Sequence, residues 1–187
     1  MDPAPVDSYL QLMDWQREAA LRELAALEDE LLWVRPSLKE WSPGEHLSHT
    51  VIVHGFFRTL HQLLWPFASF VAKRRLHQPF HATIDDVYAR PGFPHAIGRL
   101  WPPTYSPRRP ASFEQLAMEI RKEHSLLRLF YTTKDGEVLC RAPLYYPSMG
   151  WINYTQSLRV ALFHDAHHFA EIRGALSLVN PGRPPSE

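Results

Sequence analysis

The sequence predicts an all-α protein, a four-helix bundle with a long proline-rich connection between the second and third helices. Three observations predict it. Four segments of roughly 22 to 28 residues are almost free of Pro and Gly, as long helices are. Two of these segments open on serine capping signals. Of the 17 prolines, seven fall between Pro79 and Pro110, outside the segments. Possible strands at 138–140 and 144–146 are too short to build a sheet.

The first helix is expected over residues 6–33. Leu21, Leu24, Leu27 and Leu31 recur at helical spacing. Either Asp2 or Asp7 can cap its start.

The second helix has the strongest start signal. Ser42 can cap it, Pro43 suits the first helical position, and Glu45 completes a capping box. The helix is expected to reach about Trp65, where Pro66 must end or kink it. A continuation toward Arg75 is the longer alternative.

The third and fourth helices complete the bundle. Ser112 and Gln115 form a second capping box for a helix to about Thr133, and 135–136 (Asp-Gly) predict a turn. The fourth helix is expected over residues 155–179, before Asn-Pro-Gly at 180–182.

The chain is expected to form one domain over residues 1–187, with residues 181–187 as a tail. A length of 187 residues allows one sizeable core. The irregular connection over 77–111 is long for a compact domain, and such connections are usually functional or mobile.

Composition and sequence pattern argue against several classes of partner and location. The 20 basic and 20 acidic residues balance, which argues against nucleic acid as a partner. The longest nearly apolar stretch, 63–72, is too short to cross a membrane, and the N-terminus carries no signal peptide pattern. The lone Cys140 cannot form an internal disulfide and is interpreted as a small buried side chain. We therefore expect a cytoplasmic protein with no membrane partner.

The histidines of the second helix fall on different faces when their angular positions around the helix axis are compared. At about 100° per residue, His49 falls in the middle of an apolar stripe that should face the core. His54 and His61 fall on a polar face expected to meet solvent, and His46 lies on the margin. The stripe consists of Ile52, Val53, Phe56, Leu60 and Leu63.

The fourth helix carries a second set of imidazoles. His164 and His168 are four residues apart, so both face the same way and can share one metal ion. Glu171 falls on the same stripe. Imidazoles facing a core are costly unless paired, and a single divalent ion bridging His49, His164 and His168 would satisfy all three. The alternative is that they are hydrogen-bonded core histidines without a metal.

Two blocks together resemble the DinB/YfiT-like superfamily of small metalloenzymes. Residues 41–49 (WSPGEHLSH) are similar to the family pattern W-S-x-x-E-x-L-x-H. Residues 164–172 (HDAHHFAEI) are similar to H-D-x-H-H-x-x-(Q/E)-I. The 77–111 segment departs from the family and leaves open any substrate inferred from relatives.

The resemblance implies a four-helix bundle whose three histidines hold a divalent ion; the matching positions are His49, His164 and His168. Zn, Ni or Fe are the expected metals. Family members include thiol-dependent S-transferases and a mycothiol-dependent maleylpyruvate isomerase, and members often dimerise. A low-molecular-weight thiol as cosubstrate, a small-molecule substrate and a homodimer are therefore expected.

Two functional hypotheses follow. In the first, the ion lowers the pKa of a bound water or thiol, and Glu171 takes a proton or orients a ligand. The alternative for Glu171 is a solvated charge on the helix surface. Asp165 is expected to orient an external group or to be solvated. In the second hypothesis, the protein is a non-catalytic, stress-related metal-binding or scaffold protein with a structural or degenerate site. Tyr145, Tyr146 and Trp151 are expected to pack the bundle end or to line the pocket.

Overall fold

The computed structural model describes residues 5–25, 27–91, 93 and 100–179. The elements follow in the order α1 (Val6–Ala25), α2 (Asp29–Leu32), α3 (Pro43–Lys73), α4 (Phe113–Thr132), α5 (Gly136–Leu139), β1 (Pro143–Tyr146), β2 (Gly150–Asn153) and α6 (Tyr154–Val179). The described chain is therefore mostly helical, as predicted.

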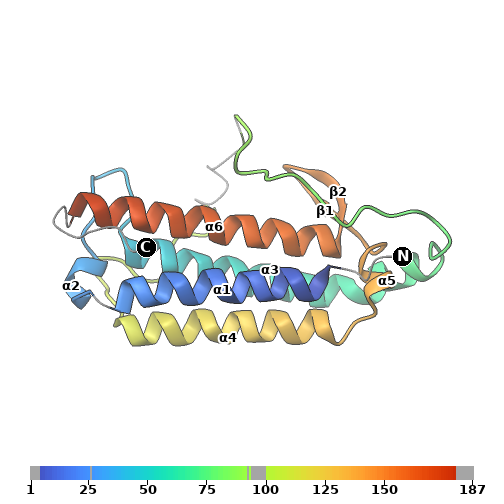
Figure 1. The fold of residues 1–187 in the computed structure, drawn as a ribbon, viewed down its shortest axis with the longest axis horizontal. Coiled ribbons are helices and arrows are strands. Elements are labelled where there is room, and N and C mark those ends of the chain that lie inside the picture. Colours follow the sequence, from blue (N-terminus) through green and yellow to red (C-terminus); the bar gives the residue numbers. More distant parts are fainter. Residues whose placement is uncertain (1–4, 26, 92, 94–99, 180–187) are drawn as a thin grey trace.

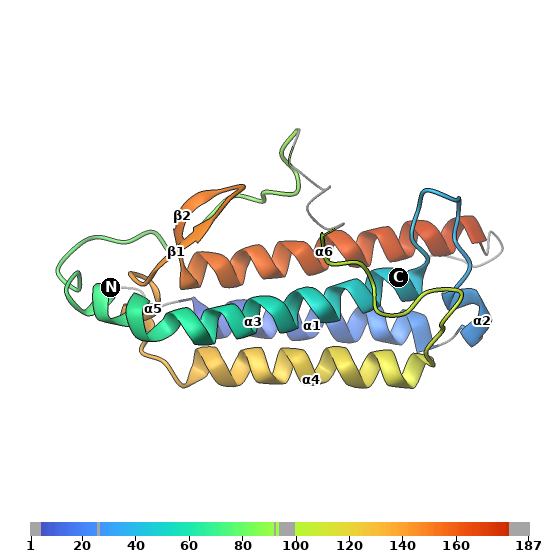
Figure 2. The ribbon, with the colours of Figure 1, turned by 180° about the vertical axis from the view of Figure 1, so that it is seen from behind.

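The four long helices α1, α3, α4 and α6 lie side by side (Figures 1 and 2). Helix α3 packs against both α4 and α6, and α1 packs against the same two helices. One apolar cluster, with Leu10 and Tyr154, fills the half of the bundle near the hairpin. A second cluster, with Leu24 and Phe169, fills the half near α2. The face of α3 between α4 and α6 is consequently inside the protein.

The predicted first helix is interrupted. Helix α1 ends at Ala25, and the short α2 follows as a separate element. The Leu32 side chain is buried, and the Trp33 indole N–H donates to the Ala111 carbonyl over 3.1 Å. These contacts hold α2 against the segment before α4, which a continuous helix could not do.

The start of α3 is confirmed in detail. Ser42 accepts from the Glu45 backbone N–H, and the Glu45 carboxylate accepts from the Ser42 N–H over 3.0 Å. Gly44 lies close to α2, because a Cβ there would meet the Trp33 ring at 2.9 Å and the Leu32 carbonyl oxygen at 3.0 Å. Pro66 lies inside the helix, which continues to Lys73, so the longer alternative is correct.

The expectation of no sheet is wrong. Strands β1 and β2 pair antiparallel, with Leu144 opposite Ile152, and Gly150 has a φ of 76° where the turn ends. Leu144 and Ile152 are buried against the bundle core, which stabilises a hairpin too short to be stable alone. Asp135 begins a short helix, α5, by accepting from the N–H groups of residues 137 and 138.

Between α3 and α4, the described residues form turns, bends and one isolated bridge, Ser106 to Arg109. This connection starts at the hairpin end of the bundle and ends near α2, where α4 begins (Figures 1 and 2). Asn153 donates to the His81 carbonyl over 2.7 Å, and the Tyr105 N–H donates to the Ser48 hydroxyl over 3.2 Å. Among the described helices, none is both long and apolar enough to cross a membrane.

Candidate metal centre

The first turn of α3 places two imidazoles at the α2 end of the bundle. The buried Glu45 closes the capping box and also accepts from Arg35 Nε over 2.7 Å. Although burial raises the pKa of Glu45, the guanidinium and the Ser42 N–H outweigh it and lower that pKa. The anchored carboxylate therefore fixes where α3 begins, and with it the positions of His46 and His49.

The structure brings together the three histidines predicted to share an ion. His49 of α3 lies 4.8 Å from His168 and 5.4 Å from His164 of α6, and the two α6 rings are 4.5 Å apart, centroid to centroid. One nitrogen from each ring lies within 4.8 Å of the other two. His49, His164 and His168 are 1%, 6% and 8% exposed.

Neighbouring groups orient these rings through Nδ1. The His49 Nδ1–H donates to the Trp101 carbonyl over 2.7 Å. His168 Nδ1 pairs with His46 Nδ1 over 3.0 Å. These bonds leave Nε2 of His49 and of His168 as the ligand atoms. His164 Nδ1 is buried without a hydrogen-bond partner among the described residues, 3.6 Å from Asp165 Oδ1.

The electrostatics favour neutral imidazoles. Burial, and next the proximity of His164, lower the pKa of His49 to about 4. Burial also lowers the pKa of His164, lowers that of the neighbouring His46 to about 4, and holds that of His168 well below its ordinary value. All three ligand candidates are therefore unprotonated at neutral pH, as metal ligands must be.

Aromatic side chains surround the cluster. Trp41 lies 4.9 Å from the His49 ring and is stacked on His168 at 6.3 Å. Tyr88, from the 77–111 connection, lies 5.8 Å from His164. Since Trp101 belongs to the same connection, this segment contacts the imidazoles at two places.

The donor set fits a divalent transition ion. Three neutral imidazoles suit Zn, Ni or Fe, and three protein ligands leave coordination positions for water or substrate. The unpaired buried nitrogen of His164 and the hydrogen bonds to the other two Nδ1 atoms are the pattern found around metal-binding histidines.

Comparisons with known proteins identify the family of the chain. Residues 12–172 match the family model of the DinB superfamily. The chain belongs to the DinB superfamily. A search of curated proteins gave no match. Among solved structures, it is similar to YfiT from Bacillus subtilis, described as "a probable metal-dependent hydrolase with an unusual four-helix bundle topology". The two share 14% identity with a TM-score of 0.61, over 91% of this chain and 85% of YfiT.

This DinB protein holds a second polar cluster that the sequence did not predict. His54 Nε2 lies 2.6 Å from Asp165 Oδ1, and His124 Nε2 lies 3.2 Å from Asp165 Oδ2. The expectation that His54 faces solvent is wrong, and so is the solvated alternative for Asp165, since the two residues are 3% and 0% exposed. A single-helix projection assumes one buried face, whereas α3 packs against α4 and α6 at once.

His61 is also buried, contrary to prediction. Its ring contacts the hydroxyls of Ser157 at 3.2 Å and of Tyr131 at 3.4 Å. Burial lowers the pKa of His61 to about 3. Conversely, Phe56 and Leu63 of the predicted core stripe are exposed. The buried face of α3 is therefore rotated, relative to the predicted one, toward His54 and His61, whose rings contact polar groups inside the bundle.

The other candidate residues differ in their exposure to solvent. Glu171 is exposed on α6; its assigned role stays a prediction. Tyr145 and Trp151 are exposed and pack on each other at 5.4 Å, while Tyr146 bonds Ser157 at 2.8 Å. The Cys140 side chain is buried as expected, and burial raises its pKa.

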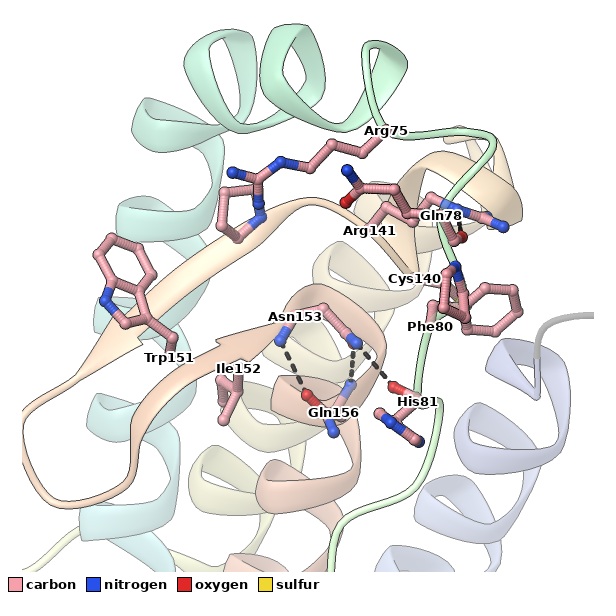
Figure 3. A pocket seen from close by; sticks show the side chains of 12 residues that line it. Arg75, Gln78, Phe80, His81, Cys140, Arg141, Trp151, Ile152, Asn153 and Gln156 are labelled. Atoms are coloured by element: carbon pink, nitrogen blue, oxygen red, sulfur yellow. Dashed lines mark hydrogen bonds between the residues drawn. The ribbon is translucent and has the colours of Figure 1, made fainter.

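A groove of about 320 Å³ lies at the opposite end of the bundle. Figure 3 shows it between the end of α3, the hairpin and the start of α6, with Asn153 bonded to Gln156 and His81. Arg75 in its wall is 26 residues after His49, about 39 Å along a helix. The groove is therefore distinct from the candidate metal centre.

Proposed function

We propose that this DinB protein is a divalent-metal-dependent enzyme acting on a small molecule, with His49, His164 and His168 as the metal ligands. The observation that carries the proposal is the convergence of three buried, neutral imidazoles from two helices. When bound, a divalent ion supplies a Lewis acid that makes a nucleophile of water or of a low-molecular-weight thiol at neutral pH.

The chain's own residues hold and enclose that site. The Trp101 carbonyl and His46 fix the ring orientations of His49 and His168. Trp41 and Tyr88 add apolar surface beside the imidazoles, which excludes bulk water and suits the apolar part of a small substrate. Glu171 is proposed as the group that relays a proton to solvent, which its exposed position on α6 permits.

The similarity to YfiT supports hydrolysis, because that protein is described as a probable metal-dependent hydrolase. Thiol transfer is the second catalytic option, from the resemblance of the two histidine blocks to S-transferases. The two differ in the nucleophile alone, so one assay with and without thiol separates them.

A non-catalytic metal-binding protein is the alternative. The near-complete burial of the three imidazoles favours it, since a structural ion is normally closed off from solvent.

The test is a screen of the metal-loaded protein against esters and amides without thiol, and against electrophiles with several thiols. We expect turnover that His168→Ala lowers by about 100-fold or more, from loss of a ligand. The matched control, His77→Ala, changes an exposed histidine and should leave turnover unaltered. Glu171→Gln should lower kcat while metal content stays the same. Equal activity of wild type and His168→Ala would refute the site; no turnover with a full metal complement would favour the alternative.

A further inference from the structure

We propose that His54, His124 and Asp165 form a second divalent-metal site in the core of the bundle. The ligands would be two imidazole nitrogens and a carboxylate, and the ion a first-row transition metal such as Zn²⁺ or Fe²⁺. This site shares no residue with the proposed catalytic centre and does not depend on its function.

The geometry brings one donor from each of three helices to one point. His54 belongs to α3, His124 to α4 and Asp165 to α6. One ligand atom from each lies within 4.8 Å of the other two. The rings of His54 and His124 are 4.6 Å apart and meet at 76°, so they approach the carboxylate from different directions.

Several polar atoms of this cluster lack hydrogen bonds. Both ring nitrogens of His124 and Oδ2 of Asp165 are buried without a hydrogen-bond partner among the described residues. His124 Nε2 approaches Oδ2 to 3.2 Å, but without the geometry of a hydrogen bond. A buried polar atom left unpaired costs about 1 to 3 kcal/mol. An ion at this point would satisfy His124 Nε2 and Oδ2 together.

The charges also fit. The carboxylate of Asp165 is fully buried, so its charge must be compensated inside the protein. A divalent ion with two neutral imidazoles and one carboxylate leaves a single net positive charge.

The two distances from the histidine nitrogens to the carboxylate are close to the donor spacings of a metal site. Ligand atoms about 2.0 to 2.2 Å from a common ion lie about 3 to 3.5 Å from one another. The contact from His124 to Asp165 is 3.2 Å, within that range, and the 2.6 Å contact from His54 would lengthen slightly. Two histidines and a carboxylate are a donor set used for Zn and non-haem Fe.

The second site would be a close neighbour of the first. Asp165 directly follows His164 in α6, and the rings of His54 and His164 are 6.1 Å apart. Two ions would therefore lie side by side inside the bundle, each with its own ligands.

The experiment counts Co²⁺ per chain by elemental analysis after expression with Co²⁺ supplied, because a core site must fill as the chain folds. Wild type should carry two ions. His124→Asn and His168→Ala should each carry one, and the double variant none. The matched control is His61→Asn, a buried histidine of α3 that contacts Ser157 and Tyr131 hydroxyls; it should keep two ions.

A wild type with one ion, lost in His168→Ala and kept in His124→Asn, would overturn this inference and leave the proposed function intact. A wild type with one ion, lost in His124→Asn and kept in His168→Ala, would support this inference and overturn the proposed function. A wild type without any ion would overturn both. If His124→Asn does not fold, His168→Ala decides alone: one remaining ion supports the second site, and none refutes it.

Discussion

The metal affinity of the three-histidine centre should hardly depend on pH between 7.5 and 6.0. Ordinary imidazoles, with a pKa near 6.5, are mostly protonated at pH 6.0, and a metal must displace those protons. Relative to pH 7.5, the cost is about 0.8 kcal/mol for each ligand, about fourfold in affinity, and about 50-fold for three ligands.

The buried imidazoles of this protein avoid that competition. Burial and His164 lower the pKa of His49 to about 4, so at pH 6.0 it is still neutral. Burial likewise lowers the pKa of His164 and of His168. Removal of a proton therefore adds almost nothing to the cost of binding, and the expected change in Kd is less than about threefold.

The assay is competition between the protein and a chromophoric chelator for Zn²⁺ at pH 7.5 and 6.0, with circular dichroism to verify equal helix content. His124→Asn serves as the parent, so that a single site is measured. A fall in affinity of about 50-fold, after correction for the chelator, would show that the three rings titrate as exposed histidines and would refute the reasoning.

Three further predictions concern stability and assembly. Because burial lowers the pKa of His61 to about 3, the neutral ring stabilises the folded protein fully above pH 6.5, and this stabilisation is lost as pH falls toward 3. The free energy of unfolding in urea should fall between pH 7.5 and pH 5.0, and the fall should be smaller by about 2 kcal/mol in His61→Gln than in wild type. Equal falls in the two proteins would contradict this. Gly44→Ala should destabilise by about 1 to 3 kcal/mol through its clash with Trp33. Gly174→Ala, with nothing within 4 Å, should stabilise by up to about 1 kcal/mol; the reverse order of melting temperatures would exclude the clash. Finally, we propose a homodimer through the exposed apolar stripe of α3, where Phe67 is 70% exposed. Light scattering should show a dimer that Phe67→Glu dissociates. Leu38→Glu, a change at an exposed residue outside α3, should leave the dimer intact, and a monomeric wild type would exclude the proposed dimer.

Features fixed by local chemistry were predictable from the sequence. Ser42 and Glu45 specified the start of α3, because a capping box depends on residues three apart. The spacing of His164 and His168 specified their common face on α6, and both lie beside His49 as predicted. The two histidine blocks identified the superfamily, which the family model over residues 12–172 confirms.

Features that depend on several neighbours were not predictable in this way. The burial of His54 and His61 requires that α3 pack on two helices, which a projection of one helix does not contain. The pairing of His54 with Asp165 joins residues 111 positions apart. A signal was present in the sequence, since His54, His124 and Asp165, which directly follows His164, could have been considered together as one cluster. The hairpin formed because Leu144 and Ile152 pack on the bundle core, although their strands are short.

The most direct test of the account is anomalous diffraction from crystals of the metal-loaded protein, recorded on both sides of the metal absorption edge. The account predicts a peak among His49, His164 and His168, with Nε2 of His49 and His168 about 2.0 to 2.1 Å from the ion. A map from fully loaded protein that lacks a peak among these three rings would contradict the central claim.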